Sequence, residues 1–311
     1  MKTIALHPGI PDVENFRSVL AGIASDLRVV ILTEETDDCS IEVIVIWQDL
    51  PPMVANLPSL RLILVCGAGI DGILEKAALL PHVLLARIVD PMLQDYVSDY
   101  IVMATLNHSR QWNYYMQLQR EKCWKWKKKS QMRPKVGIMG LGSMGGRAAH
   151  KLQSLGFEVC GWVRVGSHSA SILPEIYQGK EELFQFAQEC NVLVCALPLT
   201  SETIGILSTS LFNQLQRGTY LINVGRGRHL NESDMLKALD SGQLSGACLD
   251  TFETEPLPVD HPFWTHSRIT ITPHIAGVLL AENQATHAAK MLSEFFISGV
   301  LERVVDFNAQ Y

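Results

Sequence analysis

An arginine, a glutamate and a histidine follow three strand-like runs in the last third of the sequence. Arg226 follows TYLINVG, Glu255 follows GACLDTFET, and His274 follows RITITP. An arginine guanidinium can bind a carboxylate through two parallel hydrogen bonds. A histidine beside a carboxylate has its pKa raised toward or above neutral, where it can give or take a proton. These residue types therefore predict a site that binds an organic acid and transfers a proton.

Each of these residues also has a purely structural interpretation. Arg226 could be a surface cation, Glu255 an ordinary loop acid and His274 a satisfied turn histidine. Gly225 and Gly227 favour the catalytic interpretation, because glycines permit a strained turn that aims the arginine into a cleft. The nine other histidines are not spaced for metal binding with a second histidine or cysteine, so we predict no metal site.

A glycine-rich segment, GLGSMG, lies between the strand-like run KVGIM and the helix-like run RAAHKLQSLG. Glycines permit a tight turn and a close backbone approach there, so that a pyrophosphate can bind at the helix N-terminus. With a second strand about 20 residues further on, this context favours dinucleotide binding over a simple βα turn. The residues expected to contact the dinucleotide here are Gly140, Gly142, Ser143, Met144 and Gly145.

Parallel sheets are needed to position these groups, because ligands bind beyond the carboxyl ends of parallel strands. Short β-rich runs alternate with amphipathic segments twice, once before residue 93 and once after residue 134. Residues 93–129, which contain no glycine or proline, are expected to form a connecting helix. Residues 281–298 are expected to form an amphipathic helix that stops at Gly299 and returns to the first domain. This pattern predicts an α/β protein of two domains.

The composition restricts the kind of partner. The chain has 311 residues, of which 47% are apolar, and a net charge of −6, which favours small molecules over nucleic acid or anionic membranes. No segment approaches about 18 uninterrupted apolar residues. We therefore expect neither export nor membrane spanning, and a cytoplasmic location by default. The seven cysteines are never spaced as CxxC, and we expect reduced, mostly buried thiols.

The run REKCWKWKKKS, residues 120–130, is basic and contains two tryptophans. Interleaved aromatic and basic side chains can bind single-stranded nucleic acid by stacking and charge attraction. The chain as a whole has a net negative charge, which gives no reason to expect a nucleic-acid partner. A solvated helix end explains the same residues. We therefore expect no nucleic-acid partner.

Five motifs, GLGSMG, ALPLTSET, LINVGRG, LDTFETEPLP and TPHIAG, occur in this order. With the spacing of the arginine, glutamate and histidine, they make the chain resemble the D-2-hydroxyacid dehydrogenase family over nearly its whole length. It is most similar to the glyoxylate/hydroxypyruvate reductase branch. The resemblance implies a Rossmann-type dinucleotide-binding domain, residues 98–278, and a flavodoxin-like substrate domain, residues 1–97 completed by 279–311, both with parallel sheets.

The resemblance implies NAD(P)H-dependent reduction of a small 2-oxo acid, such as glyoxylate or hydroxypyruvate, to a D-2-hydroxy acid. His274 would protonate the carbonyl oxygen, Glu255 would hold and tune that histidine, and Arg226 would bind the substrate carboxylate and polarise the carbonyl. Asp250 would orient the nicotinamide end, although it could also be a charged end of a buried strand. The cofactor contacts implied after the glycine turn are Leu197, Pro198, Thr203, Val224, Gly225, Asp250, His274 and Gly277.

In the first domain, the family resemblance implies further substrate contacts. The loop CGAGID resembles one whose backbone amides, at Ala68 and Gly69, meet the substrate carboxylate. Trp47 and Arg87 match pocket positions of this branch, although a core tryptophan and a surface cation explain them as well. The segment RIVDPMLQDY departs from the family, because it carries bulky residues at 92 and 93 where relatives have a small glycine and then a methionine. The identity of the 2-oxo acid therefore stays open.

The choice of cofactor depends on the strand FEVCGWV, which is followed by Arg164. An acid at this strand end would accept bonds from both ribose hydroxyls of NAD and repel a 2′-phosphate. Val163 stands there instead, and the guanidinium of Arg164 can bind a phosphate bidentately. NADPH is therefore the expected cofactor, with NADH as the alternative if Arg164 points to solvent. Ser167 and His168 stand where NADPH-preferring relatives often carry a second basic residue.

Two further expectations come from the same resemblance. Corepressors that share this fold sense a dinucleotide and can keep the same three residues, so a binding protein is the alternative to an enzyme. Family members usually pair through the cofactor domain, which implies a homodimer. Apolar side chains that could form the contact are Trp112, Tyr114, Tyr115 and Met116; burial in the core would explain them equally.

Overall fold

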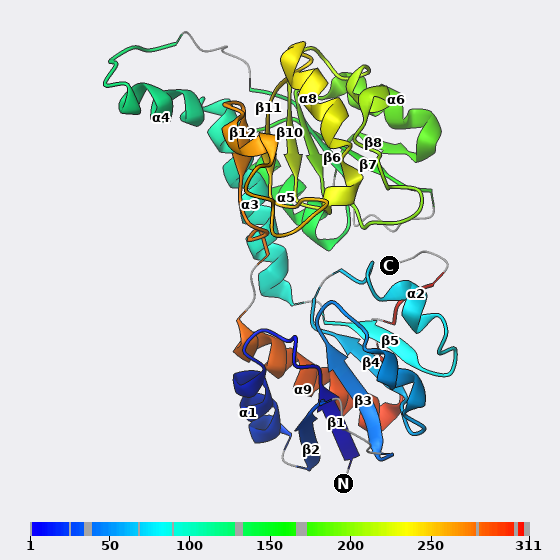
Figure 1. Ribbon diagram of the computed structural model, residues 1–311. Helices are drawn as coiled ribbons and strands as arrows, with labels where there is room; N and C mark the ends of the chain where they lie inside the picture. The colour runs from blue at the N-terminus through cyan, green and yellow to red at the C-terminus, as the bar shows by residue number, and fades with distance from the viewer. Residues whose placement is uncertain are drawn as a thin grey trace. The chain divides into compact units, whose positions relative to one another are not determined.

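The computed structural model describes residues 2–24, 26–33, 39–67, 69–88, 90–127, 133–165, 173–277, 280–301 and 304–307. The chain forms two compact units: unit 1 consists of Met1–Leu93 with Leu279–Tyr311, and unit 2 of Gln94–Val278. Each unit is built on one parallel sheet with helices around it (Figure 1). The predicted α/β class with two parallel sheets is confirmed.

Unit 1 has five strands in the order β2-β1-β3-β4-β5, which is the flavodoxin-like order. Alternate strand residues supply two cores, because Val43 and Val45 pack with the helices α1 and α9 whereas Ile44 and Ile46 pack on the opposite face. The elements of unit 1 are β1 (Lys2–Leu6), α1 (Val13–Ile23), β2 (Leu27–Ile31), β3 (Ile41–Ile46), η1 (Pro52–Asn56), β4 (Leu62–Val65), α2 (Leu74–Ala77), β5 (Leu84–Arg87) and α9 (Ala281–Ser298).

Unit 2 has seven strands in the order β12-β11-β10-β9-β6-β7-β8, with the glycine turn directly after the central strand β6. Its largest core packs Phe186, Phe212 and Met235 against the sheet. The remaining elements are α3 (Pro91–Ser109), which contains the boundary between the units, α4 (Trp112–Arg120), β6 (Val136–Met139), α5 (Ser143–Ser154), β7 (Val159–Val163), β8 (Ile176–Gln178), α6 (Gly179–Glu189), β9 (Val192–Cys195), α7 (Thr209–Phe212), β10 (Thr219–Asn223), η2 (Gly227–His229), α8 (Glu232–Asp240), β11 (Leu244–Leu249), η3 (Pro262–Thr265) and β12 (Ile269–Ile271).

The predicted single connecting helix over residues 93–129 is wrong, because the chain forms two helices there. α3 ends at Ser109 and α4 starts at Trp112, with Gln111 in the left-handed conformation at φ 58°. Figure 1 shows α4 extending to the side of the seven-stranded sheet. The segment has no glycine or proline, so the sequence carries no conventional signal for this break.

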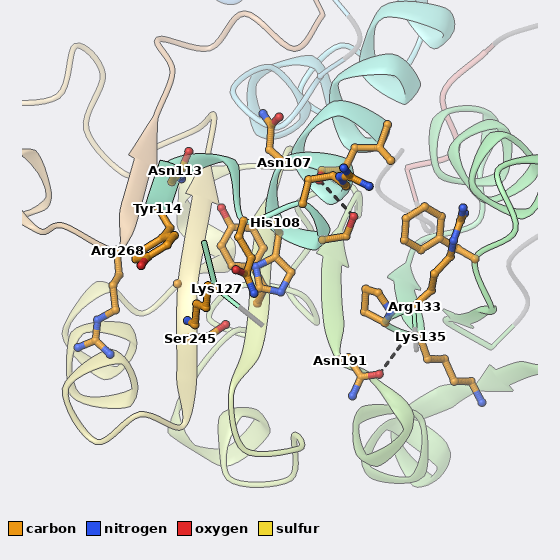
Figure 2. Close-up of a pocket in the computed structure, with 18 of the residues that line it drawn as sticks. Asn107, His108, Asn113, Tyr114, Lys127, Arg133, Lys135, Asn191, Ser245 and Arg268 are labelled. Atoms are coloured by element: carbon orange, nitrogen blue, oxygen red, sulfur yellow. Dashed lines mark hydrogen bonds between the residues drawn. The ribbon is translucent and has the colours of Figure 1, made fainter. Parts of the chain in front are cut away.

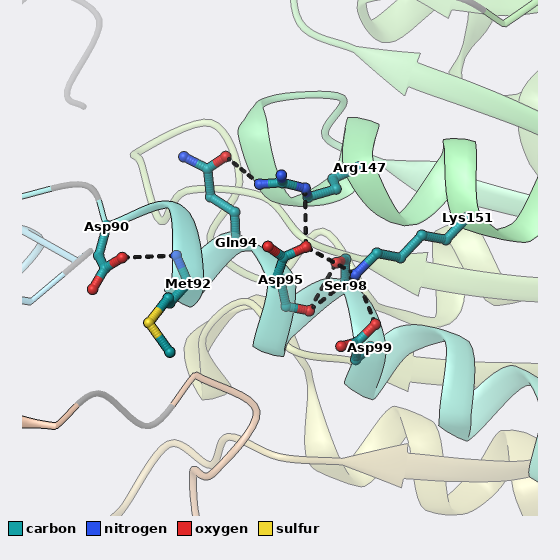
Figure 3. Close-up of polar contacts among 8 residues, drawn as sticks. All are labelled: Asp90, Met92, Gln94, Asp95, Ser98, Asp99, Arg147 and Lys151. Atoms are coloured by element: carbon teal, nitrogen blue, oxygen red, sulfur yellow. Dashed lines mark hydrogen bonds and ion pairs between the residues drawn. The ribbon is translucent and has the colours of Figure 1, made fainter. Parts of the chain in front are cut away.

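Ion pairs join α3 to α5, the helix that follows the glycine turn (Figure 3). Asp95 on α3 pairs with Arg147 and with Lys151 at 3.1 Å each, and Asp99 pairs with Lys151 at 2.7 Å. The amide oxygen of Gln94 accepts a further bond from Arg147 at 3.2 Å. Partly exposed pairs contribute little individually, about 0–1 kcal/mol each. As a network they fix the position of α5 against α3.

Candidate active site

His274 and Glu255 form a hydrogen-bonded pair beyond the carboxyl end of the sheet in unit 2. Nδ1 of His274 lies 2.7 Å from Oε2 of Glu255. The other carboxylate oxygen of Glu255 accepts the Phe252 amide at 2.9 Å. The side chains of His274 and Glu255 are 38% and 35% exposed, so a small molecule can reach them. The bond at Nδ1 orients the ring so that Nε2 is the nitrogen that can exchange a proton with a ligand.

The Glu255 carboxyl stays ionised at neutral pH. Burial raises its pKa, but hydrogen bonds from His274 and from the Phe252 amide lower it, as do the charges of His274 and Arg226. The net effect places the pKa of Glu255 below its ordinary value. The carboxylate therefore remains an acceptor for His274 and stabilises a positive charge on the imidazole.

His274 adopts a strained backbone conformation that Asp250 holds in place. Its φ is 55°, in the left-handed region, which costs a non-glycine residue about 1–3 kcal/mol. The Asp250 side chain is buried, and its carboxylate accepts the Thr272 hydroxyl at 2.6 Å and the amides of Ile275 and Ala276 at 2.9 Å each. The Asp250 carbonyl accepts the His274 amide at 2.9 Å. Asp250 thus positions the histidine, a role that the sequence did not predict.

A buried histidine supports the turn that carries Arg226. The Arg226 amide donates to Nδ1 of His229 at 2.9 Å, and the Arg226 carbonyl accepts the Asn223 side chain at 3.0 Å. Because Nδ1 of His229 is an acceptor, its proton is on Nε2, which lies 3.2 Å from the Pro198 carbonyl. His229 therefore ties the turn after β10 to the loop after β9. The sequence analysis did not predict this role of His229. The sequence indicates it only through the position of His229, three residues after Arg226.

The glycine turn between β6 and α5 has the shape that a pyrophosphate site needs. Gly140 has φ 95°, and a Cβ on Gly145 would lie 1.9 Å from the Gly140 carbonyl oxygen. Both positions therefore require glycine. Gly142 caps α5 without a side chain, and a Cβ added there would meet no atom within 4 Å. The first-turn amides of α5, at Ser143 and Met144, are groups of the kind that bind anions at helix N-termini.

Replacing Gly142 by alanine separates cofactor binding from folding. We expect the free energy of unfolding to change by less than about 1 kcal/mol, because the new Cβ enters open space at a permitted φ of −69°. The same Cβ would obstruct the backbone approach of a pyrophosphate and weaken dinucleotide binding about tenfold or more. Equilibrium titration and chemical denaturation measure the two effects.

Gly145→Ala is the matched control for Gly142→Ala. Its Cβ would overlap the Gly140 carbonyl, so this change should destabilise the fold itself. Unchanged dinucleotide affinity in Gly142→Ala would place the pyrophosphate elsewhere.

The other predicted cofactor contacts also follow strand ends of the same sheet. Thr203 is fully buried; its hydroxyl donates to the Pro198 carbonyl and accepts the Thr200 amide, at 2.8 Å each, so it shapes the loop after β9. Leu197 and Pro198 follow β9, Val224 and Gly225 follow β10, Asp250 follows β11, and Gly277 follows β12. The sheet therefore brings these loops to one edge of unit 2.

Arg164 directly follows β7, as predicted for the strand end near the adenine ribose. Its guanidinium forms an ion pair with Glu202 at 3.2 Å, and its side chain is 16% exposed. Both residues line a cavity of about 680 Å³. Ser167 and His168 lie outside the described residues.

The predicted substrate residues of unit 1 lie at the carboxyl edge of the five-stranded sheet. Trp47 directly follows β3, Gly69 lies four residues after β4, and Arg87 ends β5. Ala68 lies outside the part of the chain that the structure describes. The placement is that of ligand-binding loops in parallel sheets.

Of the two bulky residues that depart from the family pattern, only Met92 reaches the surface. Met92 is 41% exposed, and its sulfur lies 3.0 Å from the side-chain nitrogen of Asn283. Leu93 is 4% exposed. Because Leu93 is buried, the structure gives less support for direct contact of Leu93 with a substrate than for contact of Met92.

A cavity of about 1020 Å³ lies at the opposite ends of the strands in unit 2 (Figure 2). Its lining includes Asn191 and Arg268, each directly before a strand. Within it His108 stacks on Tyr220 with ring centroids 4.1 Å apart, and burial lowers the pKa of His108 to about 4. Because the catalytic candidates follow the carboxyl ends, this cavity is not their site.

Two features are absent from the described residues, a metal-binding cluster and a membrane-spanning helix. These residues contain no group of three or more histidine, cysteine or acidic residues that could hold a metal ion. None of the helices described combines the length and apolar character needed to cross a membrane.

Among the cysteines, five are buried, whereas Cys39 is exposed and Cys123 is partly exposed.

Comparison with known proteins extends over both units. Residues 102–276 match the model of the D-isomer specific 2-hydroxyacid dehydrogenase, NAD binding domain. The glyoxylate/hydroxypyruvate reductase A of Serratia proteamaculans is 36% identical over 290 residues, which cover 91% of this chain and 91% of that protein.

Solved structures show the same similarity. An NADPH-dependent glyoxylate/hydroxypyruvate reductase from Sinorhizobium meliloti, in complex with NADP and sulfate, is 34% identical with a TM-score of 0.88 over 100% of both chains. A probable 2-hydroxyacid dehydrogenase from Rhizobium etli, in complex with NADP, HEPES and L(+)-tartaric acid, is 31% identical with a TM-score of 0.91 over 100% of both chains.

Proposed function

The chain belongs to the D-isomer specific 2-hydroxyacid dehydrogenase family, and from that premise we propose that it uses NADPH to reduce a small 2-oxo acid to the D-2-hydroxy acid. Glyoxylate, hydroxypyruvate or a close analogue is the proposed substrate, after the activity of the reductases it is similar to. The observation that carries the proposal is the His274–Glu255 pair at 2.7 Å, held at the same sheet edge as the glycine turn.

The residues of unit 2 divide the chemistry among them. A bound reduced nicotinamide would supply the hydride for the carbonyl carbon. His274 donates the Nε2 proton to the carbonyl oxygen, and Glu255 stabilises the imidazolium from which that proton comes. Arg226 binds the substrate carboxylate and offsets the negative charge that develops on the carbonyl oxygen. In unit 1 we assign substrate contacts to Trp47, Gly69 and Arg87, at the loops of its sheet edge.

The cofactor assignment has two supports. The similar structures from Sinorhizobium meliloti and Rhizobium etli contain NADP. In this chain the strand β7 ends at Val163 and is followed directly by Arg164, so a cation stands near the position where an acid would repel a 2′-phosphate. The turn at Gly142 leaves open space for the pyrophosphate of either NADPH or NADH.

Steady-state assays with both cofactors test the proposed activity. Loss of cofactor absorbance should follow addition of glyoxylate, hydroxypyruvate, pyruvate or phenylpyruvate, with the highest kcat/KM identifying the preferred acid. Tight cofactor binding without turnover of any 2-oxo acid would instead support a dinucleotide-sensing binding protein. Absence of turnover with both cofactors contradicts the enzymatic proposal.

We also propose that the chain forms a homodimer through unit 2. Trp112 on α4 is 50% exposed, and Trp124 and Trp126 just after it are 80% exposed or more. Aromatic side chains are enriched at protein interfaces relative to the rest of the surface. Light scattering at micromolar concentration should give twice the mass of one chain; a monomer throughout would contradict the proposal.

A further inference from the structure

An acid from a different loop lies at the end of β7, the strand end proposed to bind the cofactor ribose. Arg164 follows β7, whereas Glu202 lies in the loop between β9 and α7, 38 residues further on. Nη1 of Arg164 and Oε2 of Glu202 are 3.2 Å apart. The sequence has no acid at the end of β7, but the fold brings the carboxylate of Glu202 close to that strand end.

The surroundings of the pair hold the arginine in place. Arg164 is 16% exposed and Glu202 is 52% exposed, so the arginine is enclosed and the glutamate borders solvent. Both line the cavity of about 680 Å³ together with Trp162, whose indole nitrogen donates to the Gly179 carbonyl at 2.8 Å. Arg164 therefore lies at the wall of this cavity, where a ligand that enters it can contact the guanidinium.

Charge balance determines what this pair does to a ligand. A lone guanidinium attracts a phosphate dianion strongly, whereas a guanidinium next to a carboxylate forms a nearly neutral pair. A 2′-phosphate that contacts Arg164 also comes close to Glu202, and the two negative groups repel each other. Among the described residues that line the cavity, the two other charged ones are Lys180 and Glu181, which carry opposite charges.

We propose that Glu202 is a specificity-determining residue that weakens NADPH binding relative to NADH. The inference rests on the proposed use of a nicotinamide cofactor at this strand end. The ribose hydroxyls of NADH bring no charge and can donate to the Glu202 carboxylate, as they do to the acid at this position in NAD-binding folds. The choice of cofactor is thus set jointly by Arg164 and Glu202, from two different loops.

Equilibrium titrations with NADP⁺ and NAD⁺, followed by protein tryptophan fluorescence, test this without relying on activity. Glu202→Gln should lower the Kd for NADP⁺ about fivefold or more, because it removes a like charge from the phosphate. The Kd for NAD⁺ should stay the same or rise. Arg164→Ala should act in the opposite direction, raising the Kd for NADP⁺ about tenfold or more with less than a twofold change for NAD⁺.

Glu175→Gln is the matched control. Glu175 is 49% exposed and pairs with Lys135 at 2.6 Å, before β8. This variant removes one negative charge and one ion pair from the same unit, so it should leave both Kd values unchanged. Melting temperatures of all variants show whether the fold is retained.

The outcomes separate this inference from the proposed function. If Glu202→Gln binds NADP⁺ no more tightly than the unchanged protein, the inference is wrong. If it binds NADP⁺ more weakly, as Arg164→Ala does, Glu202 instead orients the arginine and the inference is again wrong. If the unchanged protein binds neither dinucleotide, the proposed function itself fails.

Discussion

Replacing His274 by glutamine should lower kcat by about 10² or more while cofactor affinity stays within about twofold. Glutamine can still donate a hydrogen bond, but it cannot release a proton to the carbonyl oxygen. The cofactor contacts of the glycine turn and of the loop after β9 remain. Single-turnover kinetics with NADPH and hydroxypyruvate measure the chemical step, and a titration with NADP⁺ measures the binding.

Backbone strain at His274 requires a second variant. The residue has φ 55°, so glutamine could disturb the turn rather than the chemistry. Asparagine adopts the left-handed region more readily, and His274→Asn should show the same loss of kcat with a retained melting temperature. His150→Gln, on the exposed face of α5, is the control for histidine removal. Unchanged turnover in both His274 variants would assign the general acid to another residue.

Replacing Arg226 by glutamine should lower kcat/KM by about 10³, through a lower kcat and a higher KM. The guanidinium is proposed to bind the substrate carboxylate in the ground state and to stabilise the developing charge in the transition state. The bonds of the residue 226 backbone to His229 and Asn223 survive the substitution, whereas the bond from Nη1 of Arg226 to the Gly225 carbonyl at 2.9 Å is lost. The loss should therefore reflect the side chain alone.

Arg228→Gln is the control for the Arg226 variant. Arg228 lies two residues further along the same turn and is exposed. It should retain kcat/KM within about twofold, since isolated surface charges contribute little. A loss in Arg228→Gln as large as in Arg226→Gln would indicate that general positive charge, rather than a specific contact, binds the substrate.

Local patterns were enough to predict the fold and the strand ends that carry the site. Alternating apolar runs predict parallel strands, and parallel strands place all their carboxyl ends at one edge. The structure confirms the two parallel sheets, and the comparisons with known proteins confirm the family. The roles assigned to Arg226, Glu255 and His274 remain predictions, although the structure pairs the last two.

The supporting contacts could not be predicted from the sequence. Asp250 bonds to Ile275 and Ala276, and Glu202 bonds to Arg164, across 25 to 38 residues of chain. These pairings depend on loop conformations that no periodic pattern describes. The structure also contains the 3-residue edge strand β8, to which the sequence analysis assigned no role.

The division of unit 1 between both ends of the chain has a consequence for synthesis. Its core face is completed by Leu292 and Phe295 of α9, which follow unit 2 in the sequence and are therefore synthesised after it. Unit 2 is continuous in sequence, so it can fold while the apolar face of the β1–β5 sheet still lacks its covering helix. A nascent chain paused before residue 281 therefore exposes the apolar sheet face of an incomplete unit 1. We expect chaperones to bind the chain at that stage.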